Sequence, residues 1–97
     1  MAGTNQSPGL IHYHKGTTAF QGGKKEEALD YFLQTVEADP DFYRGWAYLG
    51  MVYNQLNKVD DAINAYRKCI EVEPNYHKAY NNIGELYRRK GALDYAA

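Results

Sequence analysis

The segment WAYLGMVY at residues 46–53 carries the pattern that decides the fold. Its large apolar side chains Trp46, Leu49 and Tyr53 are spaced three and four residues apart, which is the stripe of an amphipathic helix. A second helical stripe follows a short polar turn and ends before Pro74, because the residue before a proline avoids the helical region. The segment and its flank therefore predict two antiparallel helices joined by a tight turn.

The same pattern recurs along the chain with a period of 34 residues, and several series share one register. A fixed period of this length indicates stacked helical hairpins, because one hairpin alone cannot bury its apolar face. The series are Gly16, Gly50 and Gly84; Ala28, Ala62 and Ala96; His12, Trp46 and Tyr80; Pro40 and Pro74; Phe32 and Tyr66; Phe42 and Tyr76; and Gly23, Asn57 and Gly91.

This register divides the chain into a flexible leader at residues 1–8 and an array at residues 9–97. The units of the array are 9–42, 43–76 and 77–97, and the last is incomplete. In the third unit Gly91 is expected to form the turn, and residues 93–97 are expected to be poorly ordered because very short helices are marginal in water. Three explanations stay open for this ending: a longer array, completion by a second copy, or a capping role for the last helix.

The middle unit resembles the tetratricopeptide repeat family through Trp46-x-x-Leu49-Gly50-x-x-Tyr53, Ala62-x-x-x-Tyr66 and Pro74. The resemblance covers residues 9–97, although the first unit has His12, Lys15 and Ala19 where the second has Trp46, Leu49 and Tyr53. It implies an all-α fold of antiparallel helix-turn-helix repeats, stacked as a short right-handed α-solenoid. It also implies a protein-binding module rather than an enzyme.

The composition agrees with a soluble binding module. The net charge is −1 and no apolar run approaches the ~20 residues of a membrane span, so neither nucleic acid nor a membrane is an expected partner. The single cysteine, Cys69, favours a cytoplasmic location. No nucleophile, phosphate-loop or zinc motif is present in the sequence, and His12 and His14 point apart on a helix. We therefore expect no cofactor and no metal.

The resemblance also implies a concave groove lined by the first helix of each unit. There is an alternative interpretation of the groove positions: their exposed amide and charged side chains would simply form a solvated face, and Phe20 would be a core residue. The groove would be aromatic at one end, amide-rich in the middle and cationic at the other, which suits a peptide with an acidic group. The candidate peptide-binding residues are Tyr13, Thr17, Phe20, Arg44, Met51, Asn54, Gln55, Lys78, Asn81, Glu85, Arg88 and Arg89.

One familiar partner is not expected. Co-chaperone members of the family hold the C-terminal carboxylate of heat-shock chaperones with a two-carboxylate clamp of Lys, Asn and Arg side chains. Only Lys78 matches that clamp among the corresponding residues, which are Tyr13, Thr17, Tyr48, Lys78 and Asn82. The predicted function is therefore binding of another peptide segment, with self-assembly into a homo-oligomer through the incomplete third unit as the alternative.

Overall fold

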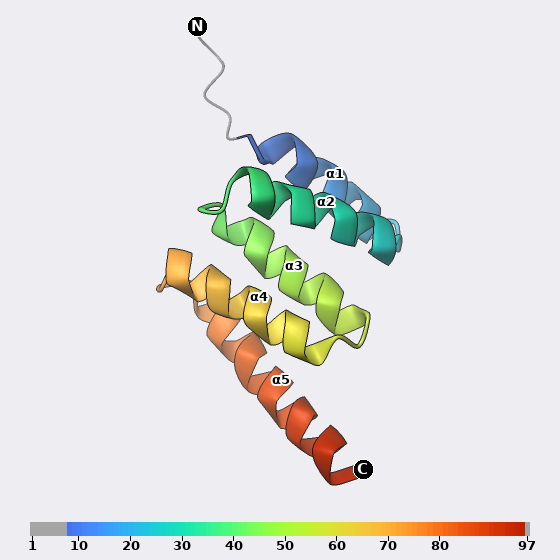
Figure 1. Cartoon of the computed structure of the whole chain (residues 1–97), viewed down its shortest axis with the longest axis vertical. Helices are drawn as coiled ribbons and strands as arrows, with labels where there is room; N and C mark the ends of the chain where they lie inside the picture. Colours follow the sequence, from blue (N-terminus) through green and yellow to red (C-terminus); the bar gives the residue numbers. More distant parts are fainter. Residues whose placement is uncertain (1–7, 97) are drawn as a thin grey trace, which may run out of the picture.

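The computed structural model describes residues 8–96, and the side chains of residues 8–92. The expected leader at residues 1–8 lies outside this part of the chain except for Pro8. No strand occurs among the described residues. The helices are α1 (Leu10–Gln21), α2 (Lys25–Ala38), α3 (Tyr43–Gln55), α4 (Val59–Val72) and α5 (His77–Ala96), as Figure 1 shows.

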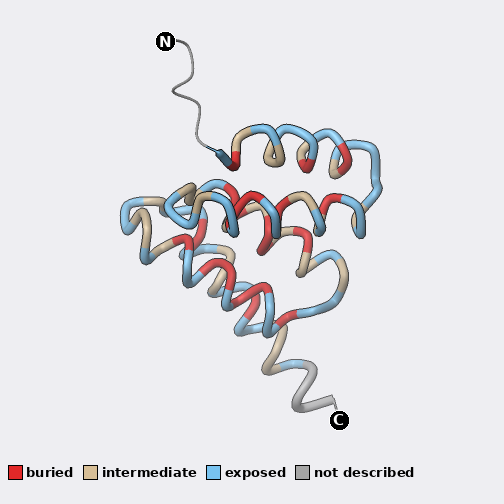
Figure 2. The backbone as a smooth tube through the Cα atoms, turned by 45° about the horizontal axis from the view of Figure 1, so that its top comes forward, coloured by how far each residue is buried: buried red, intermediate tan, exposed pale blue. Residues whose placement is uncertain are grey.

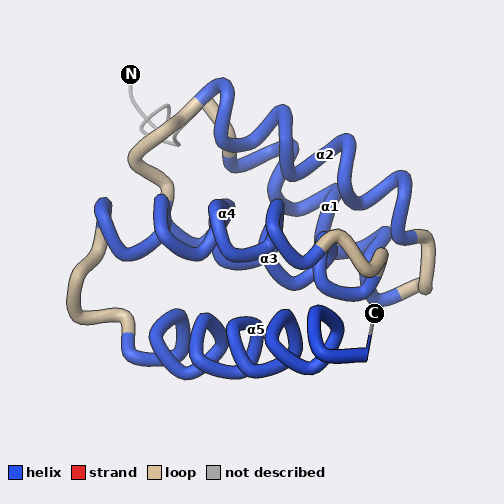
Figure 3. Tube along the Cα trace, turned by 60° about the horizontal axis from the view of Figure 1, so that its bottom comes forward, coloured by secondary structure: helices blue, strands red, loops and turns tan. Residues whose placement is uncertain are grey.

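The helices form two antiparallel hairpins and a final single helix. Helices α1 and α2 make the first hairpin and α3 and α4 the second, while α2 packs on α3 and α4 packs on α5. Figure 3 shows α5 as a separate layer against the second hairpin. This stacking confirms the predicted all-α helical repeat.

Both hairpin turns depend on a residue in the left-handed region of the backbone. Gly23 has a φ of 79° and Asn57 a φ of 64°, and Gly and Asn tolerate this region better than other residues. Each turn is closed by a backbone hydrogen bond, from the Lys24 N–H to the Ala19 carbonyl at 2.9 Å in the first hairpin. The equivalent bond in the second hairpin runs from Lys58 to Tyr53 at 2.8 Å. The repeated turn position in the sequence thus has a direct backbone cause.

The glycine of each hairpin lies under an aromatic ring of its second helix. A Cβ atom built on Gly16 would lie 2.7 Å from the Phe32 ring, and one built on Gly50 would lie 2.7 Å from the Tyr66 ring. Real Cβ atoms do not approach so closely, so these positions require glycine in the present packing. The small residues therefore allow the close helix approach that the sequence predicted.

The core consists of two apolar clusters that meet at α3. Phe32, Val52 and Cys69 are fully buried within them, and buried residues (red in Figure 2) lie where the helices face one another. Trp46 and Tyr53 pack against both clusters. The Trp46 indole N–H also donates a hydrogen bond of 2.8 Å to a backbone carbonyl of the turn between the hairpins. The shared aromatic residues make the two hairpins one packed unit.

The third unit differs from the expectation at Gly91. Helix α5 (His77–Ala96) is 20 residues long and runs through this residue without interruption, so the expected turn is absent. Gly91 has no positive φ, unlike the equivalent Gly23 and Asn57. No following helix is described against which a turn could be packed, and continuing the helix satisfies the backbone N–H and C=O groups locally. The prediction of a turn at Gly91 was wrong for this reason.

Candidate peptide-binding groove

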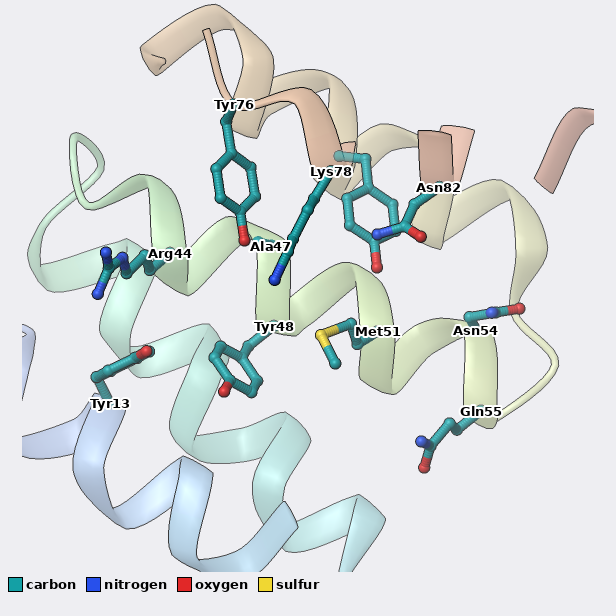
Figure 4. A pocket seen from close by; sticks show the side chains of 11 residues that line it. Tyr13, Arg44, Ala47, Tyr48, Met51, Asn54, Gln55, Tyr76, Lys78 and Asn82 are labelled. Carbon is teal, nitrogen blue, oxygen red and sulfur yellow. The ribbon is translucent and has the colours of Figure 1, made fainter. Parts of the chain in front are cut away.

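A cavity of about 540 Å³ opens between α1, α3 and the beginning of α5. We call it the central cavity. Most of its lining comes from α3, and Figure 4 shows the side chains around it. The lining residues are Tyr13, Arg44, Ala47, Tyr48, Met51, Asn54, Gln55, Tyr66, Tyr76, Lys78 and Asn82.

Half of the predicted groove residues line the central cavity. They come from all three units of the array, so the fold brings together positions far apart in the sequence. The six inside are Tyr13, Arg44, Met51, Asn54, Gln55 and Lys78. The six outside are Thr17, Phe20, Asn81, Glu85, Arg88 and Arg89.

Two of the outside residues on α1 are engaged within the fold. The half-buried Phe20 packs against the core of the first hairpin, and its ring lies edge-on to Tyr48 with centroids 5.8 Å apart. The Thr17 hydroxyl donates a hydrogen bond of 2.9 Å to the carbonyl of His14, one turn earlier on the helix. The Phe20 ring and the Thr17 hydroxyl, which were predicted from the sequence to lie in the peptide groove, are therefore in contact with other parts of the chain.

The charged α5 residues outside the cavity are also engaged. Arg88 and Glu85 form an exposed ion pair at 3.0 Å. Arg89 donates hydrogen bonds to the side-chain oxygens of Asn54 and Asn57, and a further one of 3.3 Å to the Asn54 carbonyl. Arg89 therefore ties α5 to the α3–α4 turn and holds one cavity residue in place.

The structure adds five lining residues to the twelve candidates: Ala47, Tyr48, Tyr66, Tyr76 and Asn82. Two signals in the sequence point to them. Tyr48 and Asn82 are themselves 34 residues apart, and Tyr76 belongs to the repeating series of Phe42. Tyr66 comes from α4, and a search confined to the first helix of each unit could not find it.

Aromatic rings support the wall of the cavity. Tyr13 contacts Phe42 and Tyr48, with ring centroids 4.8 Å and 5.5 Å away. Tyr48 stacks on the buried Phe32 ring at 5.2 Å. Tilted and offset ring pairs of this kind are favourable beyond the area they bury. The wall is thus held in place by the core.

The cavity is cationic at neutral pH. Burial raises the pKa of the Tyr13 phenol, with a further contribution from Tyr48, and burial also raises the pKa of Tyr66 despite its hydrogen bond with Asn82. These two phenols therefore stay neutral, and none of the lining residues is acidic. Arg44 and Lys78 carry the charge, and Lys78 extends from α5 across the cavity in Figure 4.

No metal-binding cluster and no membrane-crossing helix are found in the described part of the chain. Among the side chains of residues 8–92, no three His, Cys, Asp or Glu groups lie close enough to hold an ion. None of the helices in this range is both long and apolar enough to cross a bilayer.

Comparison with protein families agrees with the helical-repeat fold. A sequence model described as "Tetratricopeptide repeat" matches residues 13–68, and a second, described as "TPR repeat", matches residues 50–91. The chain belongs to the tetratricopeptide repeat (TPR) family. It therefore has the fold of a protein–protein interaction module.

Solved structures of TPR proteins superpose well on the chain. MamA is 30% identical with a TM-score of 0.85, and the match covers 91% of this chain and 52% of MamA. The first TPR of Spaghetti (RPAP3), bound to the HSP90 peptide SRMEEVD, is 26% identical with a TM-score of 0.81, covering 91% of this chain and 72% of that one. The Sgt2 TPR domain from Aspergillus fumigatus, at 19% identity and a TM-score of 0.84, covers 91% and 60% and shows the fold alone.

The chain spans about half the length of MamA. The comparison with curated proteins found no match.

Proposed function

We propose that this TPR array binds a peptide segment in the central cavity, and that the segment carries an acidic group beside an apolar or aromatic side chain. The observation that carries this proposal is the lining itself. It combines four tyrosines, two cations and three amides, and it contains no acidic residue.

The two cations define where the acidic group binds. Arg44 projects from α3 and Lys78 from α5, so an anion between them contacts two different elements. Arginine grips a carboxylate with two parallel N–H donors, and lysine adds a point charge. The exposed Arg44 guanidinium is steadied by the Tyr43 ring, whose centroid lies 5.8 Å from Cζ. The two positive charges favour a carboxylate or a similar anion.

The amides suit the backbone of an extended peptide. The Asn54 side-chain oxygen accepts a hydrogen bond from Arg89, so its NH₂ group is left to donate to a ligand carbonyl. Gln55 lies beside it at the exposed end of α3. Tyr48 and Met51 provide the apolar floor against which a ligand side chain can pack.

The comparison with RPAP3 supports peptide binding by an array of this fold. That domain was solved with the acidic peptide SRMEEVD bound. In this chain four of the positions that correspond to the two-carboxylate clamp line the central cavity, namely Tyr13, Tyr48, Lys78 and Asn82. Tyrosines replace cationic and amide groups there, so we expect a preference for aromatic or apolar side chains over a second carboxylate.

The test is a binding assay by fluorescence polarisation with labelled heptapeptides. The set combines one acidic residue with Phe, Leu or Ser neighbours, and SRMEEVD serves as the comparison peptide. Arg44→Glu and Lys78→Glu should each weaken the best peptide at least about tenfold, because a charge-assisted hydrogen bond contributes about 1.5–3 kcal/mol.

Arg88→Glu is the matched control, because it makes the same charge change on α5 outside the cavity. Its affinity should stay within about twofold of the parent chain, since exposed ion pairs contribute little. Equal weakening by all three variants would mean that overall charge, and not the cavity, governs binding. The absence of binding to any acidic peptide in the set would contradict the proposal.

A further inference from the structure

One face of α5 carries two exposed tyrosines and two uncovered glycines. Tyr80 and Tyr87 are 46% and 51% exposed. A Cβ atom built on Gly84 or Gly91 would meet nothing within 4 Å. We call these four residues the α5 stripe.

In both complete hairpins the same face receives an aromatic ring. Gly84 shares its register with Gly16 and Gly50, which are covered by rings from α2 and α4. A ring over a helical glycine is therefore the packing unit that this chain already uses twice. On α5 the glycine is present, but no described residue supplies the ring.

The α5 stripe is complementary to itself. The steps from Tyr80 to Gly84, Gly84 to Tyr87 and Tyr87 to Gly91 are four, three and four residues. Read from its C-terminal end, the stripe has the same spacing, with a glycine wherever the forward direction has a tyrosine and a tyrosine wherever it has a glycine. When a second α5 lies antiparallel with Tyr87 opposite Gly84, the same register places Tyr80 opposite Gly91. A two-fold interface needs such a self-complementary surface.

We propose that a second copy of this chain docks antiparallel on the α5 stripe and inserts its tyrosine rings over the glycines. The interface then contains four ring–glycine contacts, two at its centre and two outside. This gives a definite form to the oligomerisation predicted from the sequence, and it does not depend on peptide binding in the central cavity.

The continuity of α5 is essential for this interface. Like residues in the stripe recur every seven positions, Tyr80 with Tyr87 and Gly84 with Gly91, which keeps them on one side of a straight helix. A turn at Gly91 would remove the outer pair of contacts. The uninterrupted helix observed here keeps all four residues on one face.

Among the described side chains of α5, up to residue 92, the charges lie at the rim of the stripe or on other faces. Arg89 is bonded to Asn54 and Asn57, and the Lys90 ammonium lies 2.5 Å from a carboxylate oxygen of Asp60. Arg88 is already compensated by Glu85. A second copy therefore approaches a mainly uncharged surface, on which like-charge repulsion is small.

The first experiment measures the molar mass of the 97-residue chain by light scattering over a concentration series. The mass should rise toward twice the chain mass of 11.1 kDa. Gly84→Gln should keep the chain at the monomer mass, because the new side chain occupies the place of the ring. Its helical circular dichroism should be retained, since the site is open in the monomer.

Ile11→Ala is the control, because Ile11 is 59% exposed at the opposite end of the array. It should dimerise like the parent chain. A parent chain that is monomeric throughout, or a dimer that persists in Gly84→Gln, would overturn the proposal. Loss of the dimer in Ile11→Ala would also overturn it, since it would indicate end-to-end stacking of copies.

The second experiment tests the register by oxidising a mixture of Gly84→Cys and Tyr87→Cys chains. Antiparallel pairing places position 84 opposite position 87, so the mixed disulfide should dominate. Parallel pairing places 84 opposite 84, and a predominance of Gly84→Cys homodimers would overturn the antiparallel arrangement. The native Cys69 does not interfere because it is buried.

Discussion

Gly50 and Gly84 occupy the same place in the repeat but have different surroundings. The first lies under the Tyr66 ring, and the second faces open space. Sequence periodicity identifies both positions and assigns both the same role. Only the structure shows which of them is already filled.

Gly50→Ala should destabilise the chain by about 1–3 kcal/mol, because the added methyl overpacks against the Tyr66 ring. Gly84→Ala is its matched control and should stabilise the monomer by up to about 1 kcal/mol, since alanine has the higher helix propensity. Urea unfolding followed by circular dichroism, at a concentration where the chain is monomeric, gives both values. Equal effects at the two positions would refute this account of the packing.

Cys69 should be unreactive in the folded chain. Its thiol is fully buried, and burial raises its pKa from 9.0 to about 11, with a smaller contribution from Glu73. The thiolate is the nucleophile, so the reaction of Cys69 with DTNB at pH 8 should be slow in the folded chain. It should become fast once denaturant unfolds the chain. Rapid modification of the native chain would contradict the assigned burial.

The same shift makes stability depend on alkaline pH. Between pH 9 and 11 the unfolded chain loses the Cys69 proton while the folded chain keeps it, so the free energy of the unfolded state falls relative to that of the folded state. This stabilising contribution is complete below pH 9 and is lost as the pH rises through about 11. The parent chain should therefore lose more stability over this window than Cys69→Ala, as measured by urea unfolding at each pH.

The sequence predicts site residues best where the repeat position alone decides their environment. Arg44, Met51 and Lys78 line the cavity, as their places in the repeat suggested. Arg89 does not, because its side chain finds oxygen acceptors on the α3–α4 turn. Such a contact depends on where α5 lies relative to the second hairpin, which repeat spacing does not specify.

At the scale of elements, the sequence predicts α1 to α4 well and the end of α5 poorly. Glycine or asparagine at the turns and proline near the hairpin ends mark the boundaries of the first four helices. Gly91 carries the same turn signal, yet it lies inside α5. A turn residue permits a turn, but the packing of the following helix is what stabilises it.

Arg89 should be the main polar tether of α5. Arg89→Met removes its bonds to Asn54 and Asn57 while keeping the aliphatic stem, and it should cost about 1–3 kcal/mol because the arginine is partly buried and bonded to oxygen acceptors. Amide hydrogen exchange should accelerate in α5 more than in α1 to α4. Arg88→Met is the control and should change stability by less than about 0.5 kcal/mol, since its ion pair is exposed.

At the scale of the whole molecule, the cavity and the α5 stripe lie on different faces of the same helix. Lys78 and Asn82 face the cavity, whereas Tyr80 and Tyr87 are exposed on the stripe. Pairing through the stripe therefore leaves the cavity open in both copies. Such a dimer would present two sites at a fixed separation, and a partner carrying two copies of the peptide would gain avidity without any new contact.

Trp46 has a consequence for how unfolding of the array can be observed. It is the only tryptophan of the chain, it contacts both core clusters, and its indole is bonded to the carbonyl of Pro40 between the hairpins. Repeat proteins unfold through coupling between neighbouring units, which is usually difficult to observe directly. Here the fluorescence of one native side chain reports on the junction itself. When emission and helical content are recorded together, fraying of a hairpin far from the junction lowers the helical content alone. Opening of the junction changes the Trp46 emission as well.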